Sequence, residues 1–491
     1  MTTISPSQQL ETTIDPEFSA LDGVGLAAEI RAGRITPLEA VEAAIRVIKQ
    51  KNAEVNAVVM ERFERARAEA QELRKPDDHD RAPLWGVPFL VKDMNVFTAD
   101  LPTTYSSAFF ADVAPRSDSE IVRRWRRGGL ISLGKTNTPE FAADFVTEPA
   151  FRGPCRNPLD LSLSPGGSSG GAAAAVASGM VPIAHGTDSG GSIRVPASCC
   201  GLVGFKPSRG LTPVGPHYAE LAGGLNCEHV VTKTVRDTAA MLDITAGPEL
   251  GSAYVIPLPG EPYSQAIDRH PPRLRIGYTA KAPSGVEATP EIRRIFDSAV
   301  DLLRSLGHDL VPVDFPDGTD PYDVAAKLWM PAIALEIAER EAAIGRAVKP
   351  EELEPLTRHS REVGDQMSAL DYLRVRQQAH DITVGTARFF ADFDILLTPT
   401  LGTRPPLIGL FDSRSPDFDH DAWQKFAYRF APFTELFNVT GQPAISLPFP
   451  SESFDRPISG MHLAAKAGHD AILLQLAAEV EKQIRLTASF E

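Results

Sequence analysis

The chain has few cysteines for its size, with four among 491 residues. They are Cys155, Cys199, Cys200 and Cys227, and none of them belongs to a CxxC pair. So sparse a set excludes a disulfide framework and is typical of small buried thiols. We therefore expect a reducing, cytoplasmic setting.

Long apolar runs and a basic leader are also missing. The sequence has no stretch of 18 apolar residues, so no membrane span and no membrane partner are expected. The N-terminal segment MTTISPSQQLETTIDPEF has neither the basic start nor the apolar centre of a signal peptide. We expect residues 1–18 to form a flexible polar lead-in.

Positive charge is in short supply, because 49 Lys and Arg residues face 64 Asp and Glu residues, a formal net charge of −15. An acidic chain repels phosphate groups, which argues against nucleic acid as a partner. With 43% hydrophobic and 23% charged residues, the composition is that of a globular chain able to bury a large core. It excludes a disordered or collagen-like protein.

Helix-like and strand-like segments alternate along the chain. Thr36, Pro37 and Glu39 combine an N-cap, a proline at the first helical position and a capping-box glutamate, which predicts a helix from Pro37. The apolar run Leu84–Val91 predicts a buried strand that ends at Lys92. Further helices are expected at 61–73, 119–127, 172–177, 237–245, 289–306 and 472–486, and strands at 130–133, 274–278, 395–400 and 443–448. This alternation indicates an α/β fold.

Two longer segments interrupt the alternation. Residues 249–273 are rich in Pro and Gly and are expected to form a surface connection. Residues 320–392 are mostly helical by pattern, and we expect them to form a cap or lid on the α/β core.

A first glycine motif, Gly129–Thr136 (GLISLGKT), fits the P-loop pattern of nucleotide-binding proteins. A P-loop needs a strand before its first glycine and a helix directly after its last residue. Here a helix-like segment, Glu120–Arg127, comes first, and Leu130–Leu133 is itself typical of a strand. We therefore interpret Lys135 as a structural lysine.

A second motif, at residues 166–170 (GGSSG), fits the GxSxG nucleophile elbow with Ser168 as nucleophile. That motif needs a buried strand leading into a sharp turn. The preceding residues 156–165 contain two prolines and two charged residues, which is typical of a loop. His462 or His469 would have to complete such a site, and this hypothesis stays open as the minor alternative.

The longer run 166–197 (GGSSGGAAAAVASGMVPIAHGTDSGGSIRVPA) is more specific. Two serines, Ser168 and Ser192, stand in separate glycine-rich segments 24 residues apart. Gly190 and Gly191 lie directly before Ser192 and leave a row of backbone N–H groups without bulky cover. Such a row can form an anion-binding nest or an oxyanion hole.

This run resembles the signature of the amidase signature family of serine hydrolases. The likeness extends to residues 86–93 (GVPFLVKD), 134–140 (GKTNTPE), 394–400 and 441–448, and covers about residues 20–487. The matching positions of the signature are Gly166, Gly167, Ser168, Ser169, Gly170, Gly171, Ala173, Ala174, Ala184, Gly186, Asp188, Gly190, Ser192, Ile193, Arg194 and Pro196.

The resemblance implies an amidase signature fold, in which a central mixed β-sheet is flanked by helices on both sides and carries a mainly helical cap. It implies one domain over residues 19–491, with the cap at about 320–392. It also implies a Ser-cisSer-Lys triad with Ser192 as nucleophile, Ser168 as bridging serine and Lys92 as base. The bridging serine is held by a cis peptide bond to Gly167. No cofactor and no metal are expected.

The chemistry of these residues agrees with that assignment. A serine hydroxyl is a weak nucleophile and needs a neighbouring base. A lysine can be that base when it is neutral, and burial behind an apolar strand lowers the pKa of Lys92 by desolvation. A hydroxyl between the base and the nucleophile, here that of Ser168, can pass the proton from one to the other.

The glycine-rich turn supplies the remaining parts of the expected site. The backbone N–H groups of Ser189, Gly190, Gly191 and Ser192 are expected to form the oxyanion hole. Asp188 and Arg194 are expected to form a structural ion pair that supports this nest. His185 is expected to pack near the site without a catalytic role. The histidines are scattered and show no HxxxH pattern, so no metal site is expected.

Within the family, segments such as GKTNTPE and GLVGFKPSRG resemble bacterial amidases that act on nylon oligomers, together with aryl-acylamidase and urethane-cleaving relatives. This predicts a hydrolase of carboxylic amides that acts on neutral, largely apolar small molecules, with carbamates and esters as further candidates. The residues expected to line the pocket are Met94, Phe97, Phe145, His217 and Tyr218.

Two alternatives remain. One is the glutamine-hydrolysing A subunit of an aminoacyl-tRNA amidotransferase, and the other is a catalytically inactive scaffold. The presence of Lys92, Ser168 and Ser192 together argues against the scaffold. The oligomeric state is left open between a monomer and a homodimer.

Overall fold

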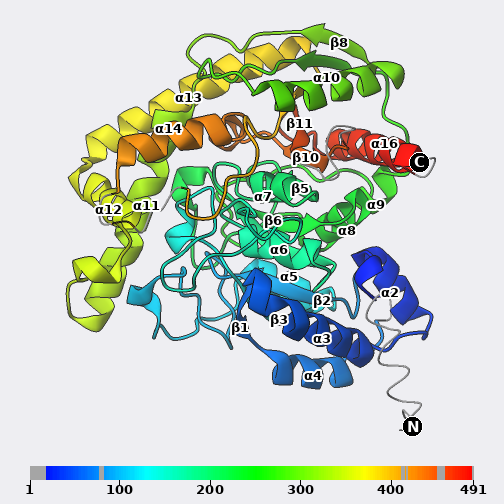
Figure 1. Ribbon diagram of the computed structural model, residues 1–491, viewed down its shortest axis with the longest axis vertical. Helices are drawn as coiled ribbons and strands as arrows, with labels where there is room; N and C mark the ends of the chain where they lie inside the picture. The colour runs from blue at the N-terminus through cyan, green and yellow to red at the C-terminus, as the bar shows by residue number, and fades with distance from the viewer. Residues whose placement is uncertain (1–17, 77–81, 411–414, 416–417, 451–458, 489–491) are drawn as a thin grey trace.

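The computed structural model describes residues 18–76, 82–410, 415, 418–450 and 459–488. Within them eleven strands form one mixed sheet in the order β1-β3-β2-β4-β6-β5-β10-β11-β9-β7-β8. Helices cover both faces of this sheet (Figure 1). The expected lead-in, residues 1–18, lies outside the described residues except for Phe18.

The elements follow one another along the whole described chain. The strands are β1 (Val58–Glu61), β2 (Pro88–Lys92), β3 (Ile131–Thr136), β4 (Ile183–Asp188), β5 (Val203–Lys206), β6 (Cys227–Thr232), β7 (Arg275–Tyr278), β8 (Asp309–Pro312), β9 (Ile395–Pro399), β10 (Ala444–Pro448) and β11 (Gly460–Ala465). The helices are α2 (Gly23–Arg31), α3 (Pro37–Val55), α4 (Phe63–Glu72), α5 (Glu120–Arg127), α6 (Gly170–Ala177), α7 (Arg194–Cys199), α8 (Val235–Thr245), α9 (Tyr263–Ala266), α10 (Pro290–Ser305), α11 (Tyr322–Ile344), α12 (Pro355–Gln366), α13 (Ala369–Asp392), α14 (His420–Phe430), α15 (Leu436–Thr440) and α16 (Asp470–Ala488).

The helix predicted from Pro37 is confirmed by α3. The Thr36 Oγ1 accepts a hydrogen bond from the Glu39 N–H at 3.2 Å, and the Glu39 carboxylate accepts one from the Thr36 N–H at 2.8 Å. These two bonds satisfy N–H groups that the first helical turn leaves without a partner.

The first half of the sheet positions the glycine-rich segments. Strand β2 is buried along its whole length and runs parallel to both β3 and β4. It begins at Pro88 and not at Leu84, because residues 83–86 form a turn. Strand β3 contains Lys135, whose buried ammonium donates to the Val96 carbonyl and the Thr103 hydroxyl. The P-loop motif is therefore part of a strand, and Lys135 is a structural residue.

The second half of the sheet is covered on both faces, because successive side chains of β9 pack into two different apolar clusters. Ile395 and Leu397 pack into one apolar cluster with α10 and α16, whereas Leu396 lies in another with α13 and α15. Strands β9, β10 and β11 pair antiparallel. Because both faces are apolar, these strands lack the polar alternation that reveals a half-exposed strand.

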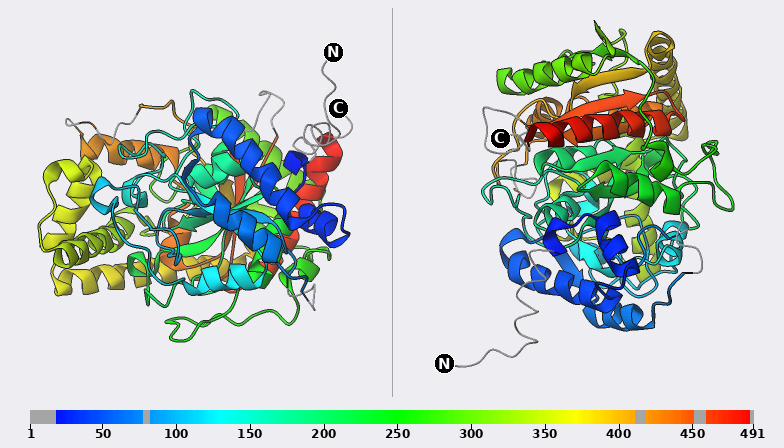
Figure 2. Two further views of the ribbon diagram at one scale, coloured as in Figure 1. Left: turned by 90° about the horizontal axis from the view of Figure 1, so that it is seen from below. Right: turned by 90° about the vertical axis from the view of Figure 1, so that its right-hand side faces the viewer.

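The cap expected at 320–392 is helical, but its three helices differ in what they cover. Helices α11 and α12 stand at one end of the molecule, and α13 runs back from them toward β8 (Figures 1 and 2). Val375, Ile382 and Phe390 of α13 belong to the same buried cluster as Leu436 of α15. Val324, Ala325 and Leu328 of α11 belong to that cluster as well. Helices α11 and α13 are thus both anchored in the core, and α12 with the rest of α11 forms the outer cap.

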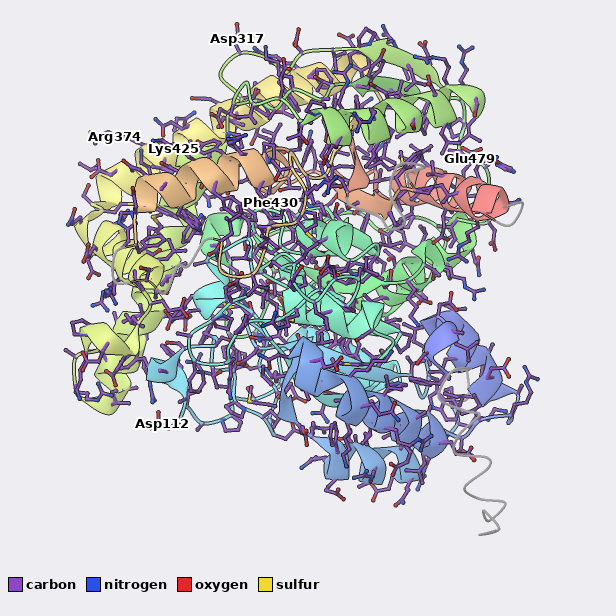
Figure 3. All side chains as sticks on the ribbon, in the orientation of Figure 1. Asp112, Asp317, Arg374, Lys425, Phe430 and Glu479 are labelled. Carbon is purple, nitrogen blue, oxygen red and sulfur yellow. The ribbon has the colours of Figure 1, made fainter. Side chains whose placement is uncertain are left out.

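Charged side chains ring the molecule, with Asp112, Arg374 and Glu479 at its rim, while Phe430 lies inside (Figure 3). Of the helices that the structure describes, none is long and apolar enough to cross a bilayer. Strands β1, β4, β5, β6, β8 and β11 were not among the strands that the sequence predicts.

The close packing of α6 leads to a prediction about stability. A Cβ added at Gly171 would lie 2.4 Å from the Asn137 backbone N and 2.5 Å from its carbonyl oxygen. Because neither backbone atom can rotate away, Gly171→Ala should lower the free energy of unfolding by about 1–3 kcal/mol. Thermal melts followed by circular dichroism measure the effect. Gly260→Ala is the matched control, since a Cβ there meets nothing within 4 Å, and an equal loss in both variants would contradict the packing argument.

Candidate active site

The candidate site lies where β2 and β4 end side by side. The two strands are parallel neighbours, with Leu90 opposite Ala184. Their carboxyl ends therefore meet at one edge of the sheet and present Lys92 and Thr187 together. Ser168 stands in the loop just before α6, which packs against this edge.

Lys92 is fully buried, and its ammonium contacts only hydroxyl groups among the described side chains. The Lys92 Nζ lies 2.7 Å from the Ser168 Oγ, 2.8 Å from the Thr187 Oγ1 and 3.1 Å from the Ser169 Oγ. Three hydroxyl groups solvate the nitrogen without a carboxylate in contact. Either protonation state of the lysine can use such partners, because a hydroxyl both donates and accepts.

Burial lowers the pKa of Lys92 to about 7, against the opposing pull of the Glu228 and Asp188 carboxylates. Desolvation disfavours the charged form, and the two carboxylates favour it without reversing the shift. A substantial fraction of Lys92 is therefore neutral near pH 7, which a lysine on the surface would not be.

A buried histidine links Lys92 to Glu228. The backbone N–H of Lys92 donates to the His185 Nδ1 at 3.2 Å, and the His185 Nε2 lies 2.6 Å from the Glu228 carboxylate. Since Nδ1 accepts, the ring proton is on Nε2 and the imidazole is neutral. Burial also lowers the pKa of His185 below its usual range, which favours the same neutral form. His185 therefore holds Glu228 in place and has no contact with Ser192 or Ser168.

An ion pair fixes the turn that follows β4. The Arg194 guanidinium donates to both carboxylate oxygens of Asp188, at 2.9 and 2.8 Å, and both side chains are fully buried. The same carboxylate accepts the Ile193 N–H at 3.1 Å. This pairing also holds the pKa of Asp188 well below its usual range. Asp188 and Arg194 thus act together as the support of the glycine-rich turn.

The C-terminal part of the chain braces the same turn. The Thr434 hydroxyl donates to the Gly190 carbonyl at 2.6 Å, and Arg194 donates to the Thr434 carbonyl at 2.8 Å. The Asn438 amide donates to the carbonyl of Asp188 at 2.8 Å. Residues more than 240 positions apart in sequence therefore set the shape of one turn.

The turn leaves its backbone donors free. Gly191 has a φ of +140°, which only glycine adopts without strain. Among the hydrogen bonds of the described residues, none uses the N–H groups of Ser189, Gly190, Gly191 or Ser192 as donor. Four successive donors without a protein acceptor form a nest that can bind a negatively charged oxygen.

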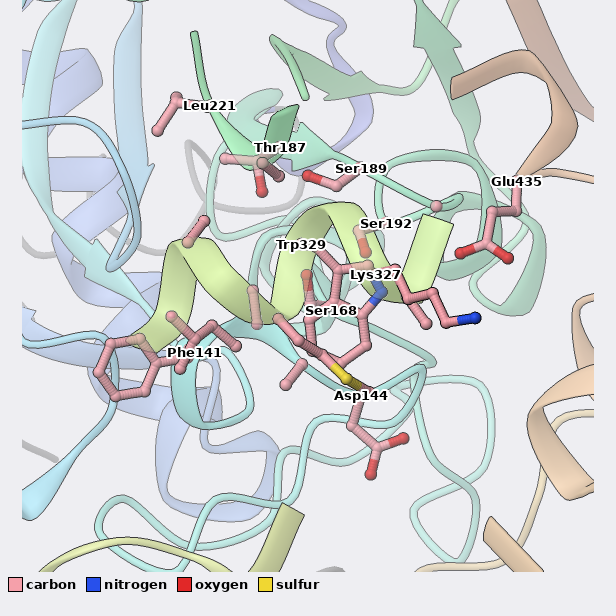
Figure 4. A pocket seen from close by; sticks show the side chains of 18 of the residues that line it. Phe141, Asp144, Ser168, Thr187, Ser189, Ser192, Leu221, Lys327, Trp329 and Glu435 are labelled. Atoms are coloured by element: carbon pink, nitrogen blue, oxygen red, sulfur yellow. The ribbon is translucent and has the colours of Figure 1, made fainter. Parts of the chain in front are cut away.

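The two signature serines face one cavity. The peptide bond between Gly167 and Ser168 is cis, and Ser168 and Ser192 both line a cavity of about 300 Å³. No hydrogen bond between the two hydroxyl groups is present in the described residues. Figure 4 shows both serines beside Thr187 and Ser189, with Trp329 of α11 crossing near them.

The wall of this cavity is mostly apolar and comes from several parts of the chain. Met94, Phe145 and Tyr218, which the sequence predicted, line it, and α11, α12 and α14 complete it. Residues of the wall that sequence reasoning missed include Leu221, Glu336, His359, Trp423 and Glu435. No motif marks them, because they reach the cavity only through the packing of distant helices.

Two predicted pocket residues do not reach the wall, which corrects the sequence analysis. The Phe97 ring is buried against His217 and Tyr218, with centroids 4.8 and 5.9 Å away. The His217 Nε2 lies 2.8 Å from the Ser117 carbonyl. His217 thus packs against Phe97 and Phe97 against Tyr218, and of these three rings only that of Tyr218 lines the cavity.

Within the described ranges, no three side chains of His, Cys, Asp or Glu stand together as metal ligands would.

Comparisons with known proteins agree with this geometry. Residues 39–474 match the family model described as amidase. A 6-aminohexanoate-cyclic-dimer hydrolase of Pseudomonas sp. (strain NK87) is 36% identical over 473 residues, which cover 94% of each chain. The solved structure of a 6-aminohexanoate cyclic dimer hydrolase complexed with substrate matches with a TM-score of 0.88 at 33% identity, over 94% of this chain and 97% of that one. A bacterial aryl acylamidase matches with a TM-score of 0.83 at 25% identity, over 94% and 96% of the two chains.

The electrostatics of Lys92 generate a prediction about pH dependence. If neutral Lys92 is the reactive form, kcat/KM should rise with pH through about 7. Glu228→Gln removes a negative charge that favours the ammonium form, so the rising limb should move about one unit to lower pH. A pH profile of kcat/KM measures both effects. Glu29→Gln, in an exposed pair with Arg34, is the control and should leave the limb in place. A limb that moves to higher pH in Glu228→Gln would contradict this assignment.

Proposed function

The chain belongs to the amidase signature family and is a hydrolase of carboxylic amide bonds, and we propose that it works through an acyl-enzyme on Ser192. In this proposal Lys92 is the base and Ser168 carries the proton between them. The observation that supports it most directly is the buried, hydroxyl-solvated Lys92, whose Nζ lies 2.7 Å from the Ser168 Oγ. No other base in the described residues contacts either signature serine.

Acylation begins with the transfer of one proton. The Ser192 Oγ attacks the amide carbonyl carbon, its proton passes to the Ser168 Oγ, and the proton of Ser168 passes to the Lys92 Nζ. A catalytic hydrogen bond of this kind often shortens only when substrate binds, so the longer Ser168–Ser192 separation in the free protein is compatible with the transfer.

The tetrahedral intermediate carries its charge on the former carbonyl oxygen. The free N–H groups of Ser189, Gly190, Gly191 and Ser192 would donate to that oxygen, and one such donor contributes about 3 kcal/mol. Lys92 then returns its proton through Ser168 to the leaving nitrogen, and the C–N bond breaks. Water attacks the ester on Ser192 by the same route and releases the carboxylic acid.

The substrates we propose are neutral, largely apolar amides, with carbamates and esters as further candidates. The apolar wall of Phe141, Phe145, Trp329 and Met330 supports this class, since it offers burial and little directional bonding. The relatives named for cyclic amide dimers and for aryl acyl amides are consistent with it.

The wall argues against glutamine as the substrate. A free amino acid needs a fixed cation for its carboxylate. No arginine lines the cavity in the described part of the chain, and the single lysine there, Lys327, pairs with Asp323 at 2.5 Å. The amidotransferase alternative therefore lacks the cation that it requires, and the aligned Lys92 and Ser168 argue against an inactive scaffold.

The setting and the partners remain part of the proposal. The four cysteines are free and buried, which supports a reducing, cytoplasmic compartment. We propose a small-molecule amide or carbamate as the only partner, and a monomer or homodimer as the working form.

Replacing the triad residues tests the mechanism. Ser192→Ala should lower kcat by at least about 10⁴-fold, because no other group can form the acyl-enzyme. Ser168→Ala and Lys92→Ala should each lower kcat by about 10²–10⁴-fold, since both remove the proton transfer. Steady-state rates and mass spectrometry of the trapped acyl-enzyme measure these effects.

Ser178→Ala is the control for the loss of a buried serine, since its hydroxyl bonds only to carbonyls within α6. An acyl group found on Ser168, together with full activity of Ser192→Ala, would establish the nucleophile-elbow alternative.

A substrate panel tests the proposed class. An apolar anilide or a linear aliphatic amide should have a kcat/KM at least about tenfold above that of glutamine, because the wall holds no free cation for a carboxylate. Initial rates with purified protein on amides, anilides, esters and carbamates provide the measurement. A tenfold preference for glutamine would revive the amidotransferase alternative.

A further inference from the structure

Glu435 is a buried acid without a visible purpose in the triad chemistry. It stands directly before α15, lines the active-site cavity and is 8% exposed. Its Oε2 has no hydrogen-bond partner among the described residues. A buried carboxyl oxygen without a partner is costly, so a group with this placement calls for an explanation.

The side chain lies against the oxyanion nest. A Cβ added at Gly190 would be 3.1 Å from the Glu435 Oε1 and 3.6 Å from the Phe145 Cζ. Glu435 therefore reaches the space next to the nest, where the carbonyl group of a substrate would sit. A substrate bound through Ser192 would have its neighbouring atoms within reach of this carboxyl group.

The other acids of the wall already have partners. Glu336 accepts hydrogen bonds from the hydroxyl groups of Tyr105 and Tyr218, at 3.1 and 2.8 Å. Asp323 pairs with Lys327. Arg194, which lies near Glu435, is committed to Asp188. The two remaining acids of the wall have partners as well, since Asp144 accepts from the Trp423 Nε1 at 3.1 Å and Glu220 accepts from the Tyr254 hydroxyl. Glu435 is thus an acid of the wall with a carboxyl oxygen that no hydrogen bond of the described residues uses.

The position of Glu435 indicates which part of a substrate it meets. The Glu435 Oε1 lies beside Gly190 of the nest, whereas Ser168 contacts Lys92, and Figure 4 draws Ser192 between the two in its view. The leaving nitrogen must face Ser168, because Ser168 delivers the proton to it. The acyl part of the substrate then extends on the side of Glu435.

We propose that Glu435 binds an N–H group in the acyl part of the substrate, so that the preferred substrates are amides whose acyl chain carries a second amide or amino nitrogen. This inference rests on the proposed function and adds one polar anchor to an otherwise apolar pocket. Burial, aided by Asp320 and opposed by Arg194, raises the pKa of Glu435 to about 8. A largely protonated carboxyl accepts an N–H and donates to a carbonyl, which suits a neutral amide better than a cation.

Matched anilides test the proposal. One carries a plain alkyl acyl chain, a second series carries an acetamido group at successive carbons of that chain, and a third carries a free amine at the same carbons. The wild-type protein should hydrolyse the best nitrogen-bearing anilide with a kcat/KM about tenfold to a hundredfold above that of the alkyl anilide. A preference for the acetamido series identifies a neutral amide as the bound group, and one for the amine series identifies an ammonium.

Glu435→Met tests whether that preference comes from this side chain. Methionine has a similar volume and no hydrogen-bonding oxygen, so the preference should fall to about onefold while the alkyl anilide is still hydrolysed. Glu352→Gln, at an exposed pair with Arg346 on the cap, is the matched control and should keep the preference. If Glu435→Met does not fold, Glu435→Leu replaces it with the same expected loss of preference. Glu435→Gln keeps one acceptor and one donor, as the protonated carboxyl does, and should retain most of the preference for an acetamido chain.

The outcomes separate this inference from the mechanism. If the wild-type protein shows no preference for a nitrogen-bearing chain, or if folded Glu435→Met keeps it, the assignment of Glu435 is overturned, while hydrolysis of the alkyl anilide leaves the proposed function intact. If none of the anilides acylates Ser192, the proposed function fails first.

Discussion

The burial of one lysine is the constraint on which the rest of the site depends. Lys92 is buried at the end of a central strand, where its Nζ has lost its water and contacts three hydroxyl groups. Hydroxyl groups can hydrogen-bond to the neutral amine as well as to the ammonium ion. A contacting carboxylate would have kept the lysine charged. Glu228 is instead held one imidazole away, so that its charge acts on Lys92 at a distance and without a bond.

The site consists of the groups that would react with the substrate and of a supporting structure that holds them in place. In the proposed mechanism the reacting groups are few: one amine, two signature hydroxyls and a row of backbone N–H groups. The supporting structure involves more residues. The turn that carries those N–H groups is held by the buried ion pair of Asp188 and Arg194 and by a hydrogen bond from Thr434. Preorganised donors of this kind need no rearrangement when charge develops on the substrate.

The residues proposed to react could be identified from the sequence, whereas the residues that support them could be identified only in part. The run 166–197 drew attention to Ser168, Ser192 and the glycine-rich turn, and their proposed roles came from the resemblance to the amidase signature. The capping residues Thr36 and Glu39 predicted the start of α3. Strands such as β6 and β11 escaped prediction because both of their faces are buried and they carry no polar alternation. Pocket residues such as Glu435 could not be predicted at all, since tertiary packing alone brings them to the cavity. Phe97 packs against Tyr218, with ring centroids 5.9 Å apart, and only Tyr218 of the two lines the cavity.

The brace between the C-terminal segment and the glycine turn has a consequence for biosynthesis. A nascent chain that has not yet emerged past Asn438 possesses the lysine and both serines but lacks the Thr434 hydroxyl and the Asn438 amide that shape the turn. Its oxyanion nest therefore lacks two of the contacts that shape it. The lysine and both serines are thus present in the growing chain before the turn that carries the N–H groups is fully braced.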